Sequence, residues 1–391
     1  MVQHDPAPTA SANALRLNAI KAVSKSRISA GEASLYCLPR RDEAWSLANV
    51  SSARTNYDHA ASSPTAVANR VLQGIDAFVL DGVLTADECD HVIATAEASE
   101  RFSFWNSEHV SGEQEESVER SFRNADTIEM DNPALAEELW QRIAPHLEAH
   151  GAAVVRVESE SEQQRWERDA EGVWDACGTN ADLLVSRYLS GGHFSPHTDG
   201  CSVMDLNYRS MYSMIVYLND CLPNSGDGGT RFYDDAVKGK FREEEWEDRA
   251  CDGDKDGAAK TRGVNTRFTA DRSMERCCVA ARRGRALVFY HNIVHEGTPP
   301  SAEGLNNGGR MVSDREQGRV FIPMGRKYII RSDVMYQRRN PICTLPQDKE
   351  AYELYRQAVE LAGQAGSEAK ALEMFKHAFS MSRNLKDIYG M

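Results

Sequence analysis

The residues in this sequence best suited to chemistry are His197 and Asp199, which form its only His-x-Asp triplet. In an extended strand, side chains two residues apart point to the same face, so an imidazole and a carboxylate would stand side by side here. Two histidines and one carboxylate on one side of a metal leave the opposite positions open, as a non-haem Fe(II) that also binds a cosubstrate and dioxygen requires. The triplet therefore predicts two of the three ligands of such a site.

The second histidine of this site has two candidates, His291 and His295. His291 is closer to the end of the strand predicted to finish near Phe289, whereas His295 precedes Glu-Gly-Thr-Pro, where another strand could begin. Spacing alone does not decide between them. We favour His295 as the third ligand, and the sequence does not show whether His291 has a metal role.

A keto acid chelated to such a metal needs a cation for its distal carboxylate, usually helped by a hydroxyl group. Lys327 and Arg331 lie on the same face of a predicted strand that follows the histidine pair, and Lys327 is the preferred cation. Arg331 is interpreted as an ordinary charge at the edge of the fold. Tyr188, Tyr217 and Thr230 occur in strand-like runs and could supply hydroxyl groups.

The composition limits the classes of protein to which this chain can belong. With 391 residues, of which 41% are hydrophobic, the chain can bury a full core, and we expect one large domain with appendages. The net charge of −14 and the pI near 5.3 argue against partners such as nucleic acids or anionic membranes, which require clustered lysine and arginine. No apolar run approaches the roughly 18 residues that span a bilayer. The oligomeric state stays open.

Cysteine usage and the amino-terminal sequence indicate a compartment. The nine cysteines include no Cys-x-x-Cys pair, which predicts mostly free thiols in a reducing environment. The amino terminus lacks the hydrophobic region of a secretory signal. We predict a cytoplasmic location, with the nucleus as an alternative. A cleaved organellar transit peptide is a further alternative, because Glu32 is the only acid within residues 15–41.

Upstream of the triplet, helices and single strands are predicted after a polar extension. Residues 1–70 are rich in Ala, Ser, Thr and Asn, which predicts a mobile N-terminal extension. A strand is predicted at Ile75–Leu80, and a helix follows the capping box Thr85–Glu88. A second helix is predicted to begin at Pro133, and a strand is predicted between the helices over residues 120–130.

Downstream of Leu183, short apolar runs are separated by glycine, asparagine and aspartate, which predicts a β-sandwich, barrel or jelly roll. The predicted strands are 183–188, 212–218, 229–233, 285–290 and 326–331. Two interruptions, near 234–276 and 305–318, are predicted to be surface insertions. Helical spacing of apolar residues returns after Pro346, which predicts a C-terminal helical tail over residues 346–391.

Five blocks of this sequence resemble the 2-oxoglutarate and Fe(II)-dependent dioxygenases of the prolyl 4-hydroxylase type, and they occur in the family's order. The blocks are Tyr188–Asp199, Ser213–Asp220, Gly228–Phe232, Gly284–Phe289 with His295–Gly297, and Gly325–Tyr328. The resemblance implies a mainly β fold with flanking helices around a double-stranded β-helix, or jelly roll, with the iron inside its mouth. It implies a dioxygenase domain over residues 71–343 that carries both insertions.

The resemblance also implies roles for single residues. His197, Asp199 and His295 would bind Fe(II), and no further residue would be catalytic. The residues implied to surround 2-oxoglutarate are Lys327, which would pair with its C5 carboxylate, the hydroxyl-bearing Tyr217 and Thr230, and the pocket residue Tyr188. One departure from the family is the long segment between His295 and Lys327, which usually follow each other closely.

The implied activity is hydroxylation of an unactivated C–H bond with 2-oxoglutarate and dioxygen, releasing succinate and carbon dioxide, with L-ascorbate as a supporting reductant. A prolyl residue of a protein or peptide is the leading substrate, and a small molecule or free amino acid is the alternative. Two other classes compete with this interpretation. One is a zinc or manganese hydrolase or isomerase in a cupin-like barrel, because the same ligands bind those metals. The other is a non-catalytic, cupin-like interaction protein that uses the extension and the helical tail.

Overall fold

The structure is a computed structural model that describes most of the chain from residue 75 onward and three short stretches before it. The described residues are 27, 29–38, 51–54, 75–105, 113–158, 168–189, 191–221, 228–246, 265–300, 309–314, 318–323, 325–364 and 366–389. Most of the extension predicted over residues 1–70 lies outside these residues.

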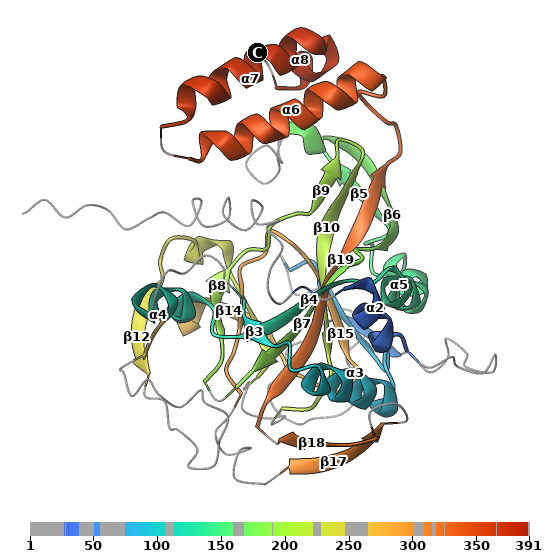
Figure 1. Cartoon of the computed structure of the whole chain (residues 1–391), viewed down its shortest axis with the longest axis vertical. Helices are drawn as coiled ribbons and strands as arrows, with labels where there is room; N and C mark the ends of the chain where they lie inside the picture. Colours follow the sequence, from blue (N-terminus) through green and yellow to red (C-terminus); the bar gives the residue numbers. More distant parts are fainter. Residues whose placement is uncertain are drawn as a thin grey trace, which may run out of the picture.

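Two antiparallel sheets form the core (Figure 1). The larger sheet has the order β1 (Ser51–Arg54), β2 (Ala77–Asp81), β15 (Ala286–Tyr290), β10 (Tyr208–Tyr217), β19 (Lys327–Arg338), β7 (Asp182–Tyr188), β4 (Asp126–Asp131) and β3 (Ser103–Phe104). The smaller sheet has the order β14 (Glu275–Val279), β11 (Thr230–Tyr233), β16 (His295–Gly297) and β8 (Phe194–His197).

The order in which the chain enters these sheets defines a jelly roll. From β7 onward, the core strands β7, β10, β15 and β19 join the larger sheet, and β8, β11, β14 and β16 join the smaller one. Eight strands divided in this way between two antiparallel sheets form a double-stranded β-helix. The predicted fold, mainly β with flanking helices around a jelly-roll core, is therefore confirmed.

Burial follows from this arrangement. Strand β15 lies between β2 and β10, and all five of its residues are buried, which explains why its sequence is a continuous apolar run rather than an alternating one. The predicted strands at 183–188, 212–218, 229–233, 285–290 and 326–331 all correspond to strands in the structure.

Two helices cover the larger sheet and begin where the sequence predicts. Helix α3 (Ala86–Ala98) has the capping box formed by Thr85 and Glu88, and helix α5 (Pro133–Leu147) begins behind Asn132, whose side chain accepts a hydrogen bond from the amide of Leu135. The two helices are joined by a buried ion pair, in which the Arg142 guanidinium lies 3.0 Å from the carboxylate of Glu88. The caps fix both helix starts, and the ion pair holds the helices beside the sheet.

Two upstream predictions need correction. The strand predicted over residues 120–130 begins only at Asp126, because Glu113–Phe122 form helix α4, which is supported by an ion pair between Glu116 and Arg120 one turn apart. Part of the predicted mobile extension is packed: helix α2 (Ala30–Ala33) and the 3-10 turn η1 (Ser34–Tyr36) pack beside α3 and α5. The side chain of Tyr36 is 1% exposed, and Ala33 accepts a hydrogen bond from Asn132.

The first region predicted to be a surface insertion contains a two-stranded hairpin, and the second contains only the first strand of one, because its partner strand runs past the predicted end at 318 to Pro323. Strands β12 (Arg242–Trp246) and β13 (Asn265–Thr269) pair in the first region, and β17 (Gly309–Asp314) of the second region pairs with β18 (Gly318–Pro323). The last two residues of the first predicted insertion already belong to core strand β14. The segments 247–264, 301–308 and 315–317 lie outside the described residues.

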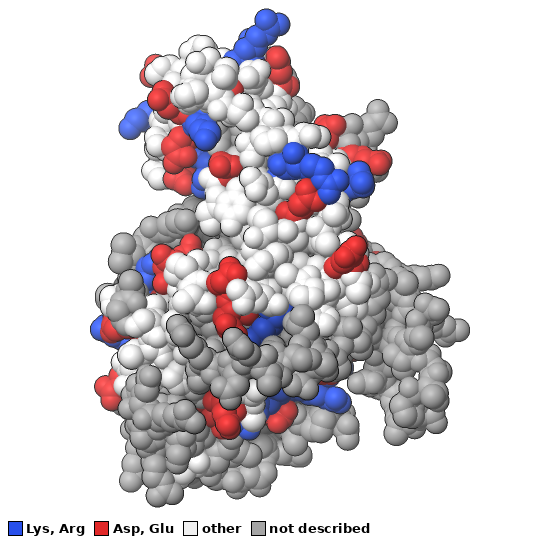
Figure 2. Space-filling model, turned by 90° about the vertical axis from the view of Figure 1, so that its right-hand side faces the viewer, with Lys and Arg blue, Asp and Glu red and all other residues white. Residues whose placement is uncertain are grey.

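The C-terminal tail contains α6 (Pro346–Ala362), α7 (Glu368–Met381) and α8 (Arg383–Tyr389), the last of which the sequence did not predict. These helices form one end of the molecule, beyond β5 (Val154–Val157), β6 (Gly172–Thr179) and β9 (Val203–Asp205) (Figure 1). On the face shown in Figure 2, acidic and basic side chains of the described residues are interspersed. Among the described helices, none is long and apolar enough to cross a bilayer.

A buried carboxylate joins the tail to the sheet. Asp169 lies 2.7 Å from the guanidinium of Arg209, both side chains are fully buried, and Tyr389 of α8 donates a hydrogen bond to the same carboxylate at 3.1 Å. Removing one member of a buried pair leaves the other charge without compensation. The tail is thus fixed by an interaction that tolerates little change.

We expect Asp169→Ala to lower the free energy of unfolding by about 3–5 kcal/mol, because the charge of Arg209 would stay buried. Urea denaturation followed by circular dichroism measures this loss. Asp175→Ala is the matched control, because Asp175 pairs with Arg339 at the surface and such pairs contribute at most about 1 kcal/mol. Equal losses in the two variants would contradict the assignment.

Candidate functional site

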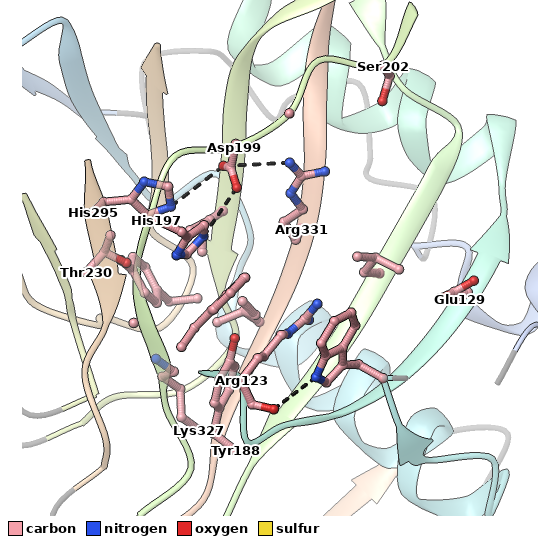
Figure 3. Close-up of a pocket in the computed structure, with 18 residues that line it drawn as sticks. Arg123, Glu129, Tyr188, His197, Asp199, Ser202, Thr230, His295, Lys327 and Arg331 are labelled. Atoms are coloured by element: carbon pink, nitrogen blue, oxygen red, sulfur yellow. Dashed lines mark hydrogen bonds and ion pairs between the residues drawn. The ribbon is translucent and has the colours of Figure 1, made fainter. Parts of the chain in front are cut away.

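Three side chains with metal-binding chemistry meet at the mouth of the jelly roll. His197 ends β8 and His295 begins β16, and these neighbouring strands place the two residues opposite each other. Nε2 of His197 lies 3.4 Å from Oδ1 of Asp199, and Nε2 of His295 lies 3.7 Å from Oδ2 (Figure 3). One ligand atom from each residue falls within 4.8 Å of the others. The structure therefore brings together the three residues that the sequence indicated.

Both imidazoles are held in the orientation that a metal ligand needs. Nδ1 of His197 lies 2.7 Å from the carbonyl oxygen of Ser195, and Nδ1 of His295 lies 3.0 Å from that of Ile293. A carbonyl accepts a hydrogen bond only from a protonated nitrogen, so these contacts place the proton on Nδ1 and leave the Nε2 lone pair free. Burial lowers the pKa of His295 to about 3, and the neighbouring His197 adds to this effect. His295 is therefore neutral at physiological pH.

Asp199 is held in its ionised form. Burial alone would raise its pKa, but the charge of Arg331 holds the pKa well below its usual value. The hydroxyl of Ser213 also donates a hydrogen bond to Oδ2 of Asp199. Ser213 orients the carboxylate, a role that the sequence did not reveal, although the residue lies in one of the blocks that carry the resemblance.

His291 points away from the three candidate ligands. Its Nε2 lies 3.4 Å from Oδ1 of Asp333, and both side chains are buried behind the site. Only its backbone approaches the site, because the carbonyl of His291 accepts a hydrogen bond from the amide of Asp199 at 3.0 Å. Of the two histidines that spacing left open, His295 is the one beside Asp199.

Arg331 is part of the site and not the edge charge that the sequence suggested. Its guanidinium lies 3.6 Å from the carboxylate of Asp199 and 3.2 Å from that of Asp333, and the residue lines the pocket. Lys327 and Arg331 are four residues apart on β19, an even spacing that puts both side chains on the same face of the strand, and both line the pocket. Arg331 is compensated by two carboxylates of the protein.

The pocket extends from these ligands toward Lys327 and has a volume of about 230 Å³ among the described residues. The ammonium of Lys327 lies 4.3 Å above the ring of Tyr188, the residue opposite it on β7. The hydroxyls of Tyr217 and Thr230 are 2.7 Å apart and line the same pocket. Burial lowers the pKa of Lys327 to about 8. The four residues predicted to surround 2-oxoglutarate thus line one cavity.

Three further pocket residues were not identified from the sequence. Phe194 stacks on His197 with ring centres 3.5 Å apart, and Trp105 donates a hydrogen bond from its indole nitrogen to the carbonyl of Arg123 at 2.9 Å. Arg123, which follows helix α4, places its side chain in the pocket. Trp105 and Arg123 come from segments upstream of all the motifs, so no spacing within those motifs indicated them.

The donor set fits a divalent transition metal such as Fe(II). Two imidazole nitrogens and one carboxylate form a three-ligand set that leaves positions for other ligands. Neighbouring ligand atoms around a metal with bonds of about 2.1 Å are about 3 Å apart, so the separations of 3.4 and 3.7 Å need only a small contraction. His197, Asp199 and His295 could hold the metal, and Lys327 could neutralise an anion bound next to it.

Residues 183–313 match the 2OG-Fe(II) oxygenase superfamily, and this segment contains all three candidate ligands. No curated protein sequence matches the chain.

Similar solved structures include a viral collagen prolyl hydroxylase from Paramecium Bursaria Chlorella virus-1 in complex with 2-oxoglutarate, with 14% identity, a TM-score of 0.34, and coverage of 68% of this chain and 99% of that chain. A Pseudomonas putida prolyl-4-hydroxylase has 14% identity and a TM-score of 0.33, and the match covers 68% of this chain and 95% of that chain. HygX from Streptomyces hygroscopicus with nickel and 2-oxoglutarate bound has 13% identity and a TM-score of 0.33, and the match covers 68% of this chain and 85% of that chain. At these TM-scores the similarities identify no substrate.

We expect His295→Ala to weaken Mn(II) binding more than about 100-fold, because changes outside the ligand shell already weaken metal binding 10–100-fold. His291→Ala is the matched control from the same segment, and its metal affinity should fall much less. Isothermal titration with Mn(II) under anaerobic conditions measures both. A larger loss in the His291 variant than in the His295 variant would exchange the two assignments.

Proposed function

We propose, from the match of residues 183–313 to the 2OG-Fe(II) oxygenase superfamily, that this protein hydroxylates an unactivated C–H bond and binds Fe(II) through His197, Asp199 and His295. The observation that carries the proposal is the convergence of these three side chains beside a pocket that contains Lys327. The matched segment ends before Lys327, so the assignment of the cosubstrate cation rests on the pocket geometry.

In the proposed reaction, one oxygen atom of dioxygen enters the substrate as a hydroxyl group and the other enters succinate. Dioxygen takes up four electrons, two from the substrate C–H bond and two from the oxidative decarboxylation of 2-oxoglutarate, which releases carbon dioxide. Bound Fe(II) supplies the activation of dioxygen. No general acid or base from the protein is needed, so the residues of the chain bind, orient and exclude water.

The cosubstrate would be bound at two ends. The ammonium of Lys327 would pair with the C5 carboxylate of 2-oxoglutarate, and the hydroxyl pair of Tyr217 and Thr230 would donate a hydrogen bond to the same group. Tyr188, under the ammonium, would hold Lys327 in place by a cation–π contact. Lys327 is 2% exposed and donates a hydrogen bond to the carbonyl of Thr298 at 3.4 Å, but it takes part in none of the ion pairs among the described residues, so its ammonium is available to a bound anion.

We propose the same two classes of substrate that the resemblance implies. A prolyl residue of a protein or peptide is the first candidate, and a free amino acid or another small molecule is the second, with L-ascorbate as a supporting reductant. The pocket volume of about 230 Å³ is below the range of roughly 300–1,000 Å³ that is typical of pockets for drug-sized ligands. Beside the cosubstrate, the described pocket therefore holds a small group.

The direct test is anaerobic addition of Fe(II) and 2-oxoglutarate to the purified full chain. The expected result is the weak visible charge-transfer band of the chelated keto acid, followed by succinate formation when oxygen is admitted. A zinc or manganese hydrolase predicts neither signal, and a non-catalytic interaction protein predicts no metal-dependent turnover. The His197→Ala variant is the control and should show no band. Absence of the band in the wild-type protein as well would reject the proposal.

We expect the 2-oxoglutarate requirement to depend on pH through Lys327. The folded pKa of Lys327 is lowered to about 8, so the ammonium carries its charge below that pH and loses it above. The KM for 2-oxoglutarate should therefore rise about 10–100-fold as the pH increases through 8, since one charge-assisted hydrogen bond is lost. Steady-state succinate assays across this range measure the change.

Lys327→Met is the control for this pH dependence. It should have a high KM for 2-oxoglutarate at every pH, with no rise near pH 8. A variant that keeps the wild-type pH profile would show that another group binds the C5 carboxylate, and Arg331 would be the next candidate.

A further inference from the structure

The pocket contains three cations among the described residues, and each can be compared with the anions available to it. Arg331 is compensated by Asp199 and Asp333, at 3.6 and 3.2 Å. Lys327 is assigned to the C5 carboxylate of 2-oxoglutarate under the proposed function. The third cation, Arg123, has no carboxylate partner among the described residues, and neither end of 2-oxoglutarate is left for it.

Arg123 is buried as well as unpaired. The residue is 8% exposed, its Nη2 donates one hydrogen bond to the hydroxyl of Ser186 at 3.3 Å, and its Nε has no hydrogen-bond partner. Arg123 also interacts with Tyr188. Burial raises the pKa of Tyr188, and the charge and the hydrogen bond of Arg123 partly offset this rise. A buried arginine is almost always paired with an anion, because an uncompensated buried charge is costly. The described part of the protein supplies only neutral partners for Arg123.

Aromatic side chains hold the guanidinium in a fixed position. Its carbon lies 4.9 Å from the ring centre of Phe194 and 5.4 Å from that of Trp105. The backbone of Arg123 forms a β-bridge with Phe194, which limits how far the side chain can move. Arginine fixed between aromatic rings presents a planar fork of donors, which matches the geometry of a carboxylate. Preorganisation of this kind is typical of a binding residue.

The position of Arg123 relative to the metal ligands limits what it can bind. Phe194 contacts Arg123 and stacks on His197, so only one aromatic ring separates the guanidinium from a candidate ligand. Figure 3 shows Arg123 and Lys327 apart, with Tyr188 between them in this view. Glu129, the other carboxylate of the pocket besides Asp199, also lies apart from Arg123 in that view. An anion on Arg123 would thus be close to the metal without occupying the cosubstrate position.

We infer that Arg123 binds a carboxylate of the substrate and places a carbon atom a few bonds away from that carboxylate beside the metal. This inference rests on the proposed function, and it selects a substrate class within it. The class is a carboxylic acid, such as a free amino acid, in preference to an internal prolyl residue, which is neutral. Arg123 is a specificity-determining residue under this assignment.

The test uses propionate, a small carboxylate that need not itself be a substrate. The full chain is loaded with Mn(II) and saturating 2-oxoglutarate, so that Lys327 and the metal positions taken by the keto acid are already occupied. Mn(II) broadens the proton NMR signals of any molecule bound next to it, and this readout needs no turnover. We expect broadening of the propionate signals, and an affinity about 10–100-fold weaker for propionamide, which has the same shape and no charge.

Two variants separate Arg123 from the rest of the protein. Arg123→Gln should lose the preference for propionate over propionamide, whereas Arg383→Gln should keep it, because Arg383 is an exposed residue of α8 with a side chain 93% exposed. Arg123→Lys keeps the charge but loses the planar fork, and should bind propionate with intermediate affinity. If Arg123→Gln fails to fold, Arg123→Lys still tests the inference, because an unchanged preference for propionate over propionamide in that variant would overturn it.

The outcomes distinguish this inference from the proposed function. Broadening of 2-oxoglutarate without broadening of propionate overturns the inference alone, and so does equal broadening of propionate and propionamide. Loss of 2-oxoglutarate broadening in Arg123→Gln would assign Arg123 to the cosubstrate and would also overturn it. If 2-oxoglutarate itself is not broadened in the wild-type protein, the proposed function is rejected.

The source of the carboxylate is tested by mass spectrometry with Fe(II), 2-oxoglutarate and oxygen. One mixture contains free amino acids, a second contains end-blocked peptides with acidic side chains, and a third contains end-blocked peptides with internal proline as their only candidate residue. Addition of one oxygen atom in the first or second mixture supports the inference and identifies the source. Addition in the third mixture at an equal or higher rate overturns it.

Discussion

The site depends on the antiparallel pairing of β8 with β16. This pairing places His295 opposite His197, although the two residues are almost a hundred positions apart in the sequence. A slip of one residue in this register would turn one imidazole to the other face of the sheet. Asp199 reaches the same point because the chain leaves β8 immediately after His197, and its amide is held by the carbonyl of His291. The geometry of the ligands is thus a property of strand register and one backbone hydrogen bond.

Charge compensation around Asp199 follows from the same geometry. A buried carboxylate beside the neutral imidazole of His295 would be costly without a positive partner. Arg331 supplies this partner, and Asp333 in turn compensates Arg331 from the other side, with His291 beside it. Through this chain of contacts, a residue that does not approach the metal position helps to keep a metal ligand ionised. The buried polar groups behind the site therefore act as its support.

The sequence predicted what is local or strictly patterned. The His-x-Asp triplet, the capping box at Thr85 and the apolar strand runs each depend on residues a few positions apart, so their structural meaning is readable without the fold. Arg123 and Ser213 were missed as site residues because their partners, Phe194 and Asp199, lie in other segments of the chain. Helix α4 was missed because its stabilising pair of Glu116 and Arg120 is a charge pattern and not an apolar stripe.

The pocket also shows why net charge does not predict the charge of a ligand. The chain carries a formal charge of −14, but its described pocket is lined by Arg123, Lys327 and Arg331 against two carboxylates, Asp199 and Glu129. Exposed charges that lie farther from the pocket than a Debye length of about 8 Å are largely screened. Inside the pocket, the low dielectric strengthens each nearby interaction.

A divalent metal would add two further positive charges at the candidate ligands. The local field then favours an anionic cosubstrate together with an anionic substrate, even though the whole protein is acidic.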